Sequence, residues 1–393
     1  MYESIRGFRF SVTEAAIKKP GRKDLALIYS ESASVMAGLF TKNKVKAAPV
    51  KLDMKRLRSG KGQAIIVNSG NANACTGEQG LKDAEKMTAL VADGLGIDHN
   101  LVYVCSTGVI GIPLPMDRIG LSIPELIRGL GSYTIRDVAS AIMTTDTFPK
   151  IVERGIKLKG VSSRIVGICK GAGMIRPDMA TMLCFILTDL NITHTALNAS
   201  LRRAVNESFN RITVDGEMST NDTVLAIANG KAGNRPIEKD SRDYRHFEST
   251  LTEVTIELSR MIVRDGEGAT KVVEIIVKNA RTDRDAQKAG YSVANSLLVK
   301  TALYGNDANW GRIMASLGYS GIALKENNID IYINGIKIVS KGLGTGKDKD
   351  PAKIFKDKDV RILIDLKMGK GCATVNTCDL SEEYVRINAE YRT

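Results

Sequence analysis

A single threonine stands where a glycine-rich segment meets a strongly apolar one. The stretch KGAGMIRPDMATMLCFILTD covers residues 170–189, and Thr181 opens its apolar part directly after the small residue Ala180. A threonine hydroxyl needs a base to act as a nucleophile. The free α-amino group of an N-terminal threonine, with a pKa of about 8, is such a base. Cleavage between Ala180 and Thr181 would create that group. Residue type alone, however, favours Thr181 as an ordinary β-branched strand residue.

Such a threonine would first process its own chain. Its Oγ would attack the Ala180 carbonyl, and the resulting ester would hydrolyse. One oxyanion hole could then serve both self-cleavage and turnover. The segment CSTGVIGIPLP (105–115) supplies a candidate, because it places Thr107 and Gly108 in a predicted turn after the strand LVYVC. Backbone N–H groups in such a turn can converge on an anion, although without a nucleophile this is only a loop.

Histidine and cysteine chemistry is disfavoured. The three histidines, His99, His194 and His246, have polar neighbours and no metal-ligand spacing, so we expect neither a metal site nor a histidine base. The six cysteines form no CxxC pair, and we expect them to be reduced, small core residues. No bound cofactor is expected.

The chain is basic, with 56 Lys and Arg against 44 Asp and Glu and a net charge of +12. A non-enzymatic basic binding protein is therefore one alternative. It is disfavoured, because aromatic residues are only 5% of the chain and the two densest basic stretches, 42–61 and 341–359, lack stacking side chains or carry mixed charge. We expect no nucleic-acid partner. No apolar leader follows Met1, and runs such as 182–187 are too short to cross a bilayer, so we expect a cytoplasmic protein without a membrane partner.

Two glycine-rich segments admit contrasting interpretations. NSGNANACTG (68–77) follows a buried strand, and a close backbone approach to a ligand and an asparagine-capped turn are about equally favoured. GLGTGKDK (342–349) is no phosphate loop, because its glycine spacing is wrong and Asp348 stands where Ser or Thr must meet Mg²⁺. A solvated hairpin loop is expected there.

The hydrophobic pattern mixes strands and helices, which predicts a layered α/β or α+β protein. The segment 341–359 is the best candidate for a linker or exposed loop, and a hairpin is predicted around Asn334 and Gly335. Strands are predicted within 63–70, 164–173, 181–190, 222–230, 271–280 and 360–381, and helices over 81–97, 194–212, 241–266 and 285–305.

The motifs, taken together, resemble the ornithine acetyltransferase (glutamate N-acetyltransferase, ArgJ) family nearly from end to end. They are KGAGMIRPDMATML, GLFTKN (38–43), NSGNANACTG, STGVIG (106–111), MTTDTFPK (143–150), STNDT (219–223), DGEGATK (265–271), DANWGRIMASLGYSG (307–321) and CDLSEEYVRINAEYRT (378–393).

This resemblance implies an acyltransferase of arginine biosynthesis that cleaves itself before Thr181. It implies an α chain, 1–180, with the oxyanion-hole loop, and a β chain, 181–393, with the nucleophile at its N-terminus, in an α2β2 assembly. The implied fold is α+β, a sandwich of two sheets between helices like that of N-terminal-nucleophile hydrolases (DmpA/ArgJ-like). The implied reaction moves acetyl from N2-acetyl-L-ornithine to L-glutamate, with acetyl-CoA as a further donor for some members.

Residue roles also follow from the resemblance alone. Thr181 matches the nucleophile, and Thr107 and Gly108 match the oxyanion hole. Residues of the 144–147 segment match a substrate contact, with Thr144 favoured over its neighbours. The remaining implied substrate-binding residues are Lys170, Glu267, Asn388 and the C-terminal Thr393.

A self-cleaving aminopeptidase or amidohydrolase of the same layout is the second alternative, since it shares the nucleophile and differs only in transferring the acyl group to water. The match through the YVRINAEYRT end favours the transferase. The chain departs from the family pattern at Met218, Asn376 and Asp178, where we expect Thr, Trp and Asn, and none of these is a named catalytic residue.

Overall fold

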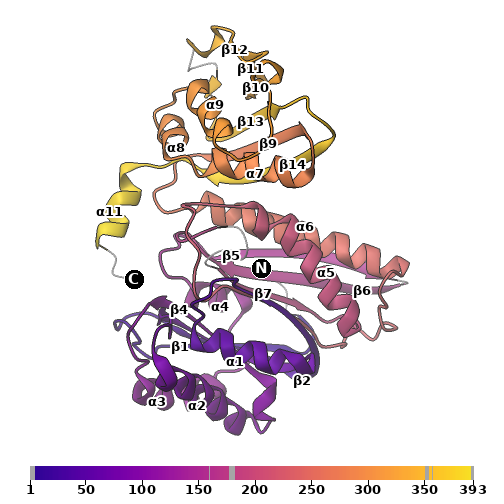
Figure 1. Ribbon diagram of the computed structural model, residues 1–393. Helices are drawn as coiled ribbons and strands as arrows, with labels where there is room; N and C mark the ends of the chain where they lie inside the picture. Colours follow the sequence, from indigo (N-terminus) through magenta and orange to yellow (C-terminus); the bar gives the residue numbers. More distant parts are fainter. Residues whose placement is uncertain (1–4, 159, 177–181, 350–353, 356, 391–393) are drawn as a thin grey trace.

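The computed structural model describes residues 5–158, 160–176, 182–349, 354–355 and 357–390. They form two lobes, each built on one β-sheet (Figure 1). The larger sheet has the strand order β4-β3-β2-β8-β7-β6-β5, with β1 paired to β2. Its strands are β1 (Phe8–Thr13), β2 (Leu25–Phe40), β3 (Lys61–Asn71), β4 (Val102–Val109), β5 (Lys150–Leu158), β6 (Val161–Lys170), β7 (Leu183–Thr188) and β8 (Thr223–Ala228).

The larger sheet folds over on itself because β2 belongs to both of its halves. On one edge, β2 pairs with β3 through residues 25–29 and again through Ser34 and Val35, with a register shift between Tyr29 and Ser34. On its other edge, residues 25–30 pair with β1 and residues 35–40 pair with β8. Side chains from the two halves, such as Ile65 of β3 and Phe185 of β7, meet in one apolar core. The result is two β-layers with a buried interface.

Helices cover both outer faces of this sandwich (Figure 1). Helices α1 (Ala48–Arg56), α2 (Gly77–Leu95) and α3 (Met116–Arg128) pack on the β2–β4 half. Helices α5 (His194–Glu207) and α6 (Arg242–Arg264) pack on the β5–β8 half. The short α4 (Ile135–Ala141) adds its apolar residues to the core between the layers.

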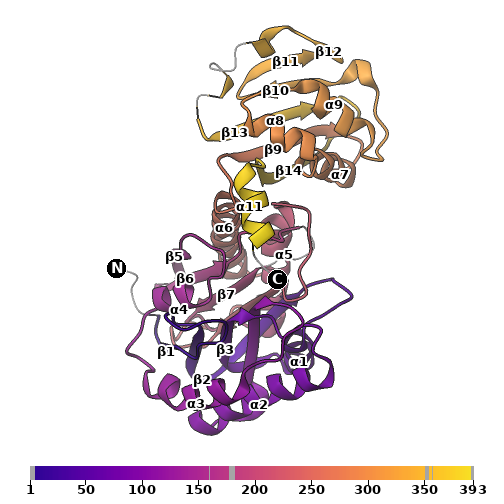
Figure 2. The same cartoon turned by 90° about the vertical axis from the view of Figure 1, so that its left-hand side faces the viewer.

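The smaller sheet has the order β12-β11-β10-β13-β9-β14 and carries its own apolar core. Its strands are β9 (Val272–Ala280), β10 (Asp330–Ile333), β11 (Ile336–Ser340), β12 (Leu343–Gly344), β13 (Asp359–Asp365) and β14 (Gly371–Cys378), and its helices are α7 (Asp283–Ala294), α8 (Leu297–Tyr304) and α9 (Trp310–Gly318). After β14 the chain forms α11 (Glu382–Glu390), which runs back toward the larger lobe (Figure 2).

The expected α+β class with two β-layers between helices is confirmed. The structure differs in detail, because the two layers are halves of one folded sheet and a second sheet forms a lobe of its own. Both sheets mix parallel and antiparallel pairs; β7 is parallel to β8 and antiparallel to β6. Position 180/181 falls between β6 and β7 of the larger sheet, so strands from both sides of that position build one lobe.

The predicted hairpin around Asn334 is confirmed, whereas the single helix predicted over 285–305 is wrong. The hairpin is present, and Asn334 and Gly335 both have positive φ angles, as its two-residue turn requires. The predicted helix 285–305 is broken into α7 and α8, because the Ser296 hydroxyl accepts a hydrogen bond from the backbone N–H of Val299 and starts a new helix.

The 341–359 segment joins β11 to β13 of the same sheet rather than linking two lobes, and its described part begins with the short hairpin strand β12. The expectation of a hairpin loop at 342–349 is wrong, because this segment contains strand β12 and the 3-10 turn Lys347–Lys349, and the hairpin turns at Lys341 and Gly342. All six cysteines lie within the described residues and are free thiols, but Cys75 and Cys372 are exposed, contrary to the expectation that all pack in the core. No helix among the described residues is long and apolar enough to cross a membrane.

Candidate active site

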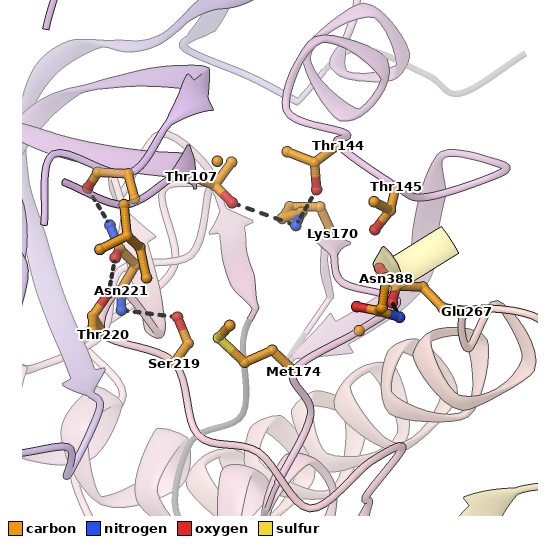
Figure 3. Close-up of a pocket in the computed structure, with 14 residues that line it drawn as sticks. Thr107, Thr144, Thr145, Lys170, Met174, Ser219, Thr220, Asn221, Glu267 and Asn388 are labelled. Carbon is orange, nitrogen blue, oxygen red and sulfur yellow. Dashed lines mark hydrogen bonds between the residues drawn. The ribbon is translucent and has the colours of Figure 1, made fainter. Parts of the chain in front are cut away.

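A cavity opens where the ends of several larger-lobe strands meet the segments that lead to and from the smaller sheet (Figure 3). It encloses about 590 Å³, including space open to solvent. Its lining is made of small, hydroxyl-bearing and amide side chains with one lysine and one glutamate. The lining residues are Ala72, Thr107, Gly108, Ile110, Thr144, Thr145, Lys170, Gly173, Met174, Ser219, Thr220, Asn221, Glu267 and Asn388.

Lys170 is the last residue of β6 and is buried, although lysines usually lie at the protein surface. Its Nζ donates hydrogen bonds to Oγ1 of Thr144 at 2.7 Å and of Thr107 at 3.4 Å. It also lies 3.8 Å from Oδ2 of Asp146. Burial lowers the pKa of Lys170, and the Asp146 carboxylate only partly offsets that effect. The amine therefore gives up its proton more readily than a lysine in water does.

Thr107 and Gly108 lie in the last residues of β4, not in a turn after the strand as predicted. The strand continues there because β4 pairs in parallel with β3 through Ser69 and Gly70. Gly108 has a φ of 135°, and a Cβ built on it would lie 2.2 Å from the carbonyl carbon of Gly70. Only glycine fits this position, which fixes the direction of the peptide groups beside the cavity.

The 144–147 segment divides between two tasks. Thr144, favoured from the sequence, reaches Lys170, and Thr145 also lines the cavity (Figure 3). Thr147 points elsewhere, because its hydroxyl and its backbone N–H both donate to the carboxylate of Asp265. Asp146 is buried beneath the cavity and does not line it.

Glu267 lies in the connection between α6 and β9, Asn388 lies in α11, and the two side chains meet at the cavity. Asn388 of α11 donates from Nδ2 to Oε2 of Glu267 at 2.9 Å. The backbone N–H of Glu267 donates to the Ala172 carbonyl at 3.0 Å, which ties this segment to the loop after β6. Figure 3 shows both side chains across the cavity from Thr107. A negative charge therefore lies at one side of the cavity and the Lys170 cation at another.

Ser219, Thr220 and Asn221 form a wall that the sequence reasoning did not assign to the site. The Asn221 side chain donates to the backbone carbonyls of Ala72 at 2.7 Å and Ser106 at 2.8 Å, which joins the start of β8 to the ends of β3 and β4. The sequence signal was the polar STNDT motif directly before a buried strand, a placement typical of a site at a strand end.

The described part of the chain resumes next to this wall. Ala180 and Thr181 lie outside the described residues, as does Thr393. Met182 is the first described residue after that gap, and its backbone N–H donates to Oδ1 of Asp222 at 3.1 Å. Leu183 then pairs with Lys170 across β6 and β7. Burial raises the pKa of the Asp222 carboxyl well above its usual range.

The NSGNANACTG segment is an asparagine-capped turn, the second of its two interpretations. Asn68 donates from Nδ2 to the Asn71 carbonyl at 2.8 Å, and Asn73 donates to the Gly80 carbonyl at 2.8 Å. Thr76 donates to Oδ1 of Asn73 at 2.7 Å. Within this segment only Ala72 lines the cavity.

The remaining candidates lie away from the cavity lining. None of the three histidines, which all fall within the described residues, belongs to the lining. Among those residues, no cluster of His, Cys, Asp or Glu has metal-binding geometry. The backbone carbonyl of Met218 accepts a hydrogen bond from Nδ2 of Asn43, and Asn376 of β14 pairs with Glu274 of β9. Asp178 lies outside the described residues.

Comparison with known proteins shows which family the chain resembles along its length. The ArgJ family profile matches residues 9–393. The arginine biosynthesis bifunctional protein ArgJ of Geobacter sulfurreducens is 53% identical over 99% of this chain and 100% of its own length. The protein of the same name from Syntrophotalea carbinolica is 48% identical over 99% of both chains. The crystal structure of the protein of that name from Bacillus halodurans is 42% identical, with a TM-score of 0.51 over 53% of this chain and 98% of that chain. The chain therefore belongs to the ArgJ family, the ornithine acetyltransferases of arginine biosynthesis.

Proposed function

We propose that the chain cleaves itself between Ala180 and Thr181 and then transfers acetyl from N2-acetyl-L-ornithine to L-glutamate through an acetyl-Thr181 intermediate. One observation carries the proposal. A buried lysine and a glutamate face one cavity beside Thr107 and Gly108, and the strand that begins two residues after Thr181 runs alongside that lysine. Acetyl-CoA is a second donor in this proposal.

In the first half-reaction, the α-amino group of Thr181 accepts the proton of its own hydroxyl as Oγ attacks the acetyl carbonyl. The oxyanion of the tetrahedral intermediate is stabilised by Thr107 and Gly108. The carbon–nitrogen bond then breaks, the proton passes from the α-ammonium group to the leaving amine, and ornithine departs. Thr181 keeps the acetyl group as an ester.

In the second half-reaction, the amine of glutamate attacks that ester. The same oxyanion hole stabilises the second tetrahedral intermediate, and the proton released by the amine returns to Thr181 Oγ as N-acetyl-glutamate leaves. A covalent intermediate between two product releases predicts ping-pong kinetics.

The charges of the cavity suit these substrates. Both are amino acids, so their carboxylate can pair with the Lys170 ammonium group. The cationic side chain of ornithine can pair with Glu267, whose carboxylate is already oriented by Asn388. Thr144 completes this set in the proposal, with Thr393 as a further contact from the chain end.

The larger sheet explains how fragments 1–180 and 181–393 would stay together after cleavage. Strand β6 precedes the cleavage position and β7 follows it, and the two pair over residues 165–170 and 183–188. The Bacillus halodurans crystal chain supports scission near the middle. Its match covers 98% of that chain but only 53% of this one, so the crystal chain is about half as long. We propose an α2β2 assembly of these fragments, small-molecule rather than nucleic-acid or membrane ligands, and a cytoplasmic location.

An intact-mass spectrum under denaturing conditions tests the proposal. Two species, 1–180 and 181–393, are expected, and N2-acetyl-ornithine should add one acetyl group to the second species only. Adding glutamate should remove that group and release N-acetyl-glutamate; acetyl-CoA should replace the first donor. Release of acetate at the same rate without glutamate would instead identify a hydrolase, and a single uncleaved species would contradict the proposal.

Gly173→Ala is expected to weaken binding of N2-acetyl-ornithine without unfolding the protein. A Cβ at Gly173 would lie 2.3 Å from Oε2 of Glu267, so that flexible carboxylate must move away from Asn388. We expect KM for this donor to rise about tenfold, kcat to change little, and the free energy of unfolding to fall by less than about 1 kcal/mol. Steady-state kinetics and thermal unfolding measure this. Gly155→Ala, with open space at its Cβ, is the matched control.

A further inference from the structure

A buried cluster of charges lies beneath the cavity, outside the residues that line it. Lys150, the first residue of β5, is fully buried. Its Nζ donates to Oδ1 of Asp146 at 2.7 Å and also to Oδ2 of Asp265. Both carboxylates are buried as well. Burying three charges without water is costly, so an arrangement of this kind needs mutual pairing to persist.

The two carboxylates of this cluster accept hydrogen bonds from the segments that carry Thr144 and Lys170, and one of them lies in the segment that carries Glu267. Asp146 accepts from the backbone N–H of Thr144 at 3.0 Å and from that of Gly171, the neighbour of Lys170, at 2.6 Å. Asp265 accepts from Thr147 and lies two residues before Glu267. Thr144, Lys170 and Glu267 are therefore positioned by the same buried ions.

Lys150 and Lys170 also share one carboxylate. Lys150 bonds Oδ1 of Asp146 at 2.7 Å, whereas Lys170 lies 3.8 Å from Oδ2. Although burial favours the neutral acid, these two ammonium groups lower the pKa of Asp146 to about 2. Burial lowers the pKa of Lys170, and repulsion by Lys150 lowers it further.

We propose that Lys150 is a positioning residue of the acetyl-transfer site, which holds the site segments together through Asp146 and Asp265 and competes with Lys170 for the Asp146 carboxylate. This inference rests on the proposed function, because it assigns Lys170 to the substrate carboxylate.

Other groups act on Lys170 and stay unchanged when Lys150 is replaced. Glu267, at the cavity, and Asp222, at the head of β8, both favour the charged lysine. The Cys169 thiol precedes it on β6, and burial raises the pKa of that thiol to about 12, so it is neutral at working pH. The effect of Lys150 is therefore separable from the rest of the surroundings.

Lys150→Met tests the proposal through the pH profile of kcat/KM. The donor is N-acetyl-L-glutamate, the reverse substrate, which has no group that titrates between about pH 6 and about pH 11. In ping-pong kinetics, the pH dependence of kcat/KM for this donor gives the pKa values of ionisable groups in the free enzyme. The acid limb follows deprotonation of the Thr181 α-amino group, and the alkaline limb follows loss of the Lys170 charge.

Without Lys150, Lys170 is the only lysine among the described residues that pairs with Asp146 and the repulsion by Lys150 is gone, so the pKa of Lys170 rises. The alkaline limb of the Lys150→Met variant is expected to move to higher pH by about one to two units, with the acid limb in place. Asp265→Asn removes a negative charge instead and should move the alkaline limb to lower pH. The double variant should lie between the two single variants.

Lys157→Met is the matched control, because Lys157 is an exposed lysine on the same strand and its loss changes the net charge equally. Its profile should equal that of the wild type. Should Lys150→Met fail to fold, the shift of the near-isosteric Asp265→Asn variant carries the test.

An alkaline limb that stays in place in the variants, with only the maximal rate reduced, would overturn the inference. A wild-type enzyme that forms no acetyl-Thr181 from N-acetyl-glutamate would overturn the proposed function instead. The two failures are therefore distinguishable.

Discussion

Thr181→Ala is expected to leave one intact chain of 393 residues and to abolish acetyl transfer. Alanine has no hydroxyl to attack the Ala180 carbonyl, so the chain stays whole. The uncleaved chain has neither the nucleophile nor the free α-amino group that activates it. We expect kcat to fall by a factor on the order of 10⁶, as happens when a covalent nucleophile is removed from other enzymes. Denaturing intact-mass spectrometry and a glutamate-dependent transfer assay measure the two effects.

Thr181→Ser is the matched control, since it keeps a hydroxyl at the same position. It is expected to cleave and to form an acetyl ester, at reduced rates. The hydrogen bond from the backbone of Met182 to Asp222, and the pairing of β6 with β7, do not involve the side chain of residue 181. The alanine variant should therefore fold with wild-type stability. Cleavage of the alanine variant at 180/181 would contradict the mechanism.

Gly108→Ala is expected to have the second largest effect, on both stability and turnover. Its Cβ would lie 2.2 Å from the carbonyl carbon of Gly70 and 2.4 Å from the backbone nitrogen of Asn71, where neither backbone group can move freely. A φ of 135° also excludes an L side chain. The strained conformation alone costs about 1–3 kcal/mol, and displacement of the peptide group should lower kcat about 10²- to 10³-fold.

Gly111→Ala is the control that separates the effect of backbone strain on stability from the effect of Gly108 on catalysis. Gly111 also has a positive φ, of 82°, but its Cβ would meet open space, and the residue does not line the cavity. It should lose stability through its backbone conformation and keep near-wild-type kcat. Chemical denaturation and steady-state kinetics compare the variants. Equal loss of kcat in both would show that Gly108 acts only through stability.

Much of the fold is local enough to be predicted from the sequence. The apolar runs that became β7 and β8 are buried on both faces, so they read as strands without any knowledge of their partners. The turn at Asn334 and Gly335 follows from the low cost of positive φ at these residue types. The motifs spread along the chain likewise predict the ArgJ family, which the comparisons confirm.

Pairing between distant segments was beyond such reasoning. The sixteen-residue β2 joins two β-layers because one of its edges pairs with β1 over residues 25–30 and with β8 over residues 35–40, and no local pattern specifies these partners. Thr107 and Gly108 were expected in a turn because they follow the apolar run LVYVC. The parallel pairing with β3 keeps them in a strand instead.

The sequence by itself thus determines which residue types the site contains, since a nucleophile, a lysine and a carboxylate can each be recognised in a motif. Their protonation and orientation are decided by the tertiary structure alone. Lys150 and Lys170 look like surface lysines in sequence, yet both are buried against Asp146, which lies on a different segment from Lys170. Burying a charge is costly unless an opposite charge or hydrogen-bond partners are brought to it, and here folding brings both lysines to Asp146.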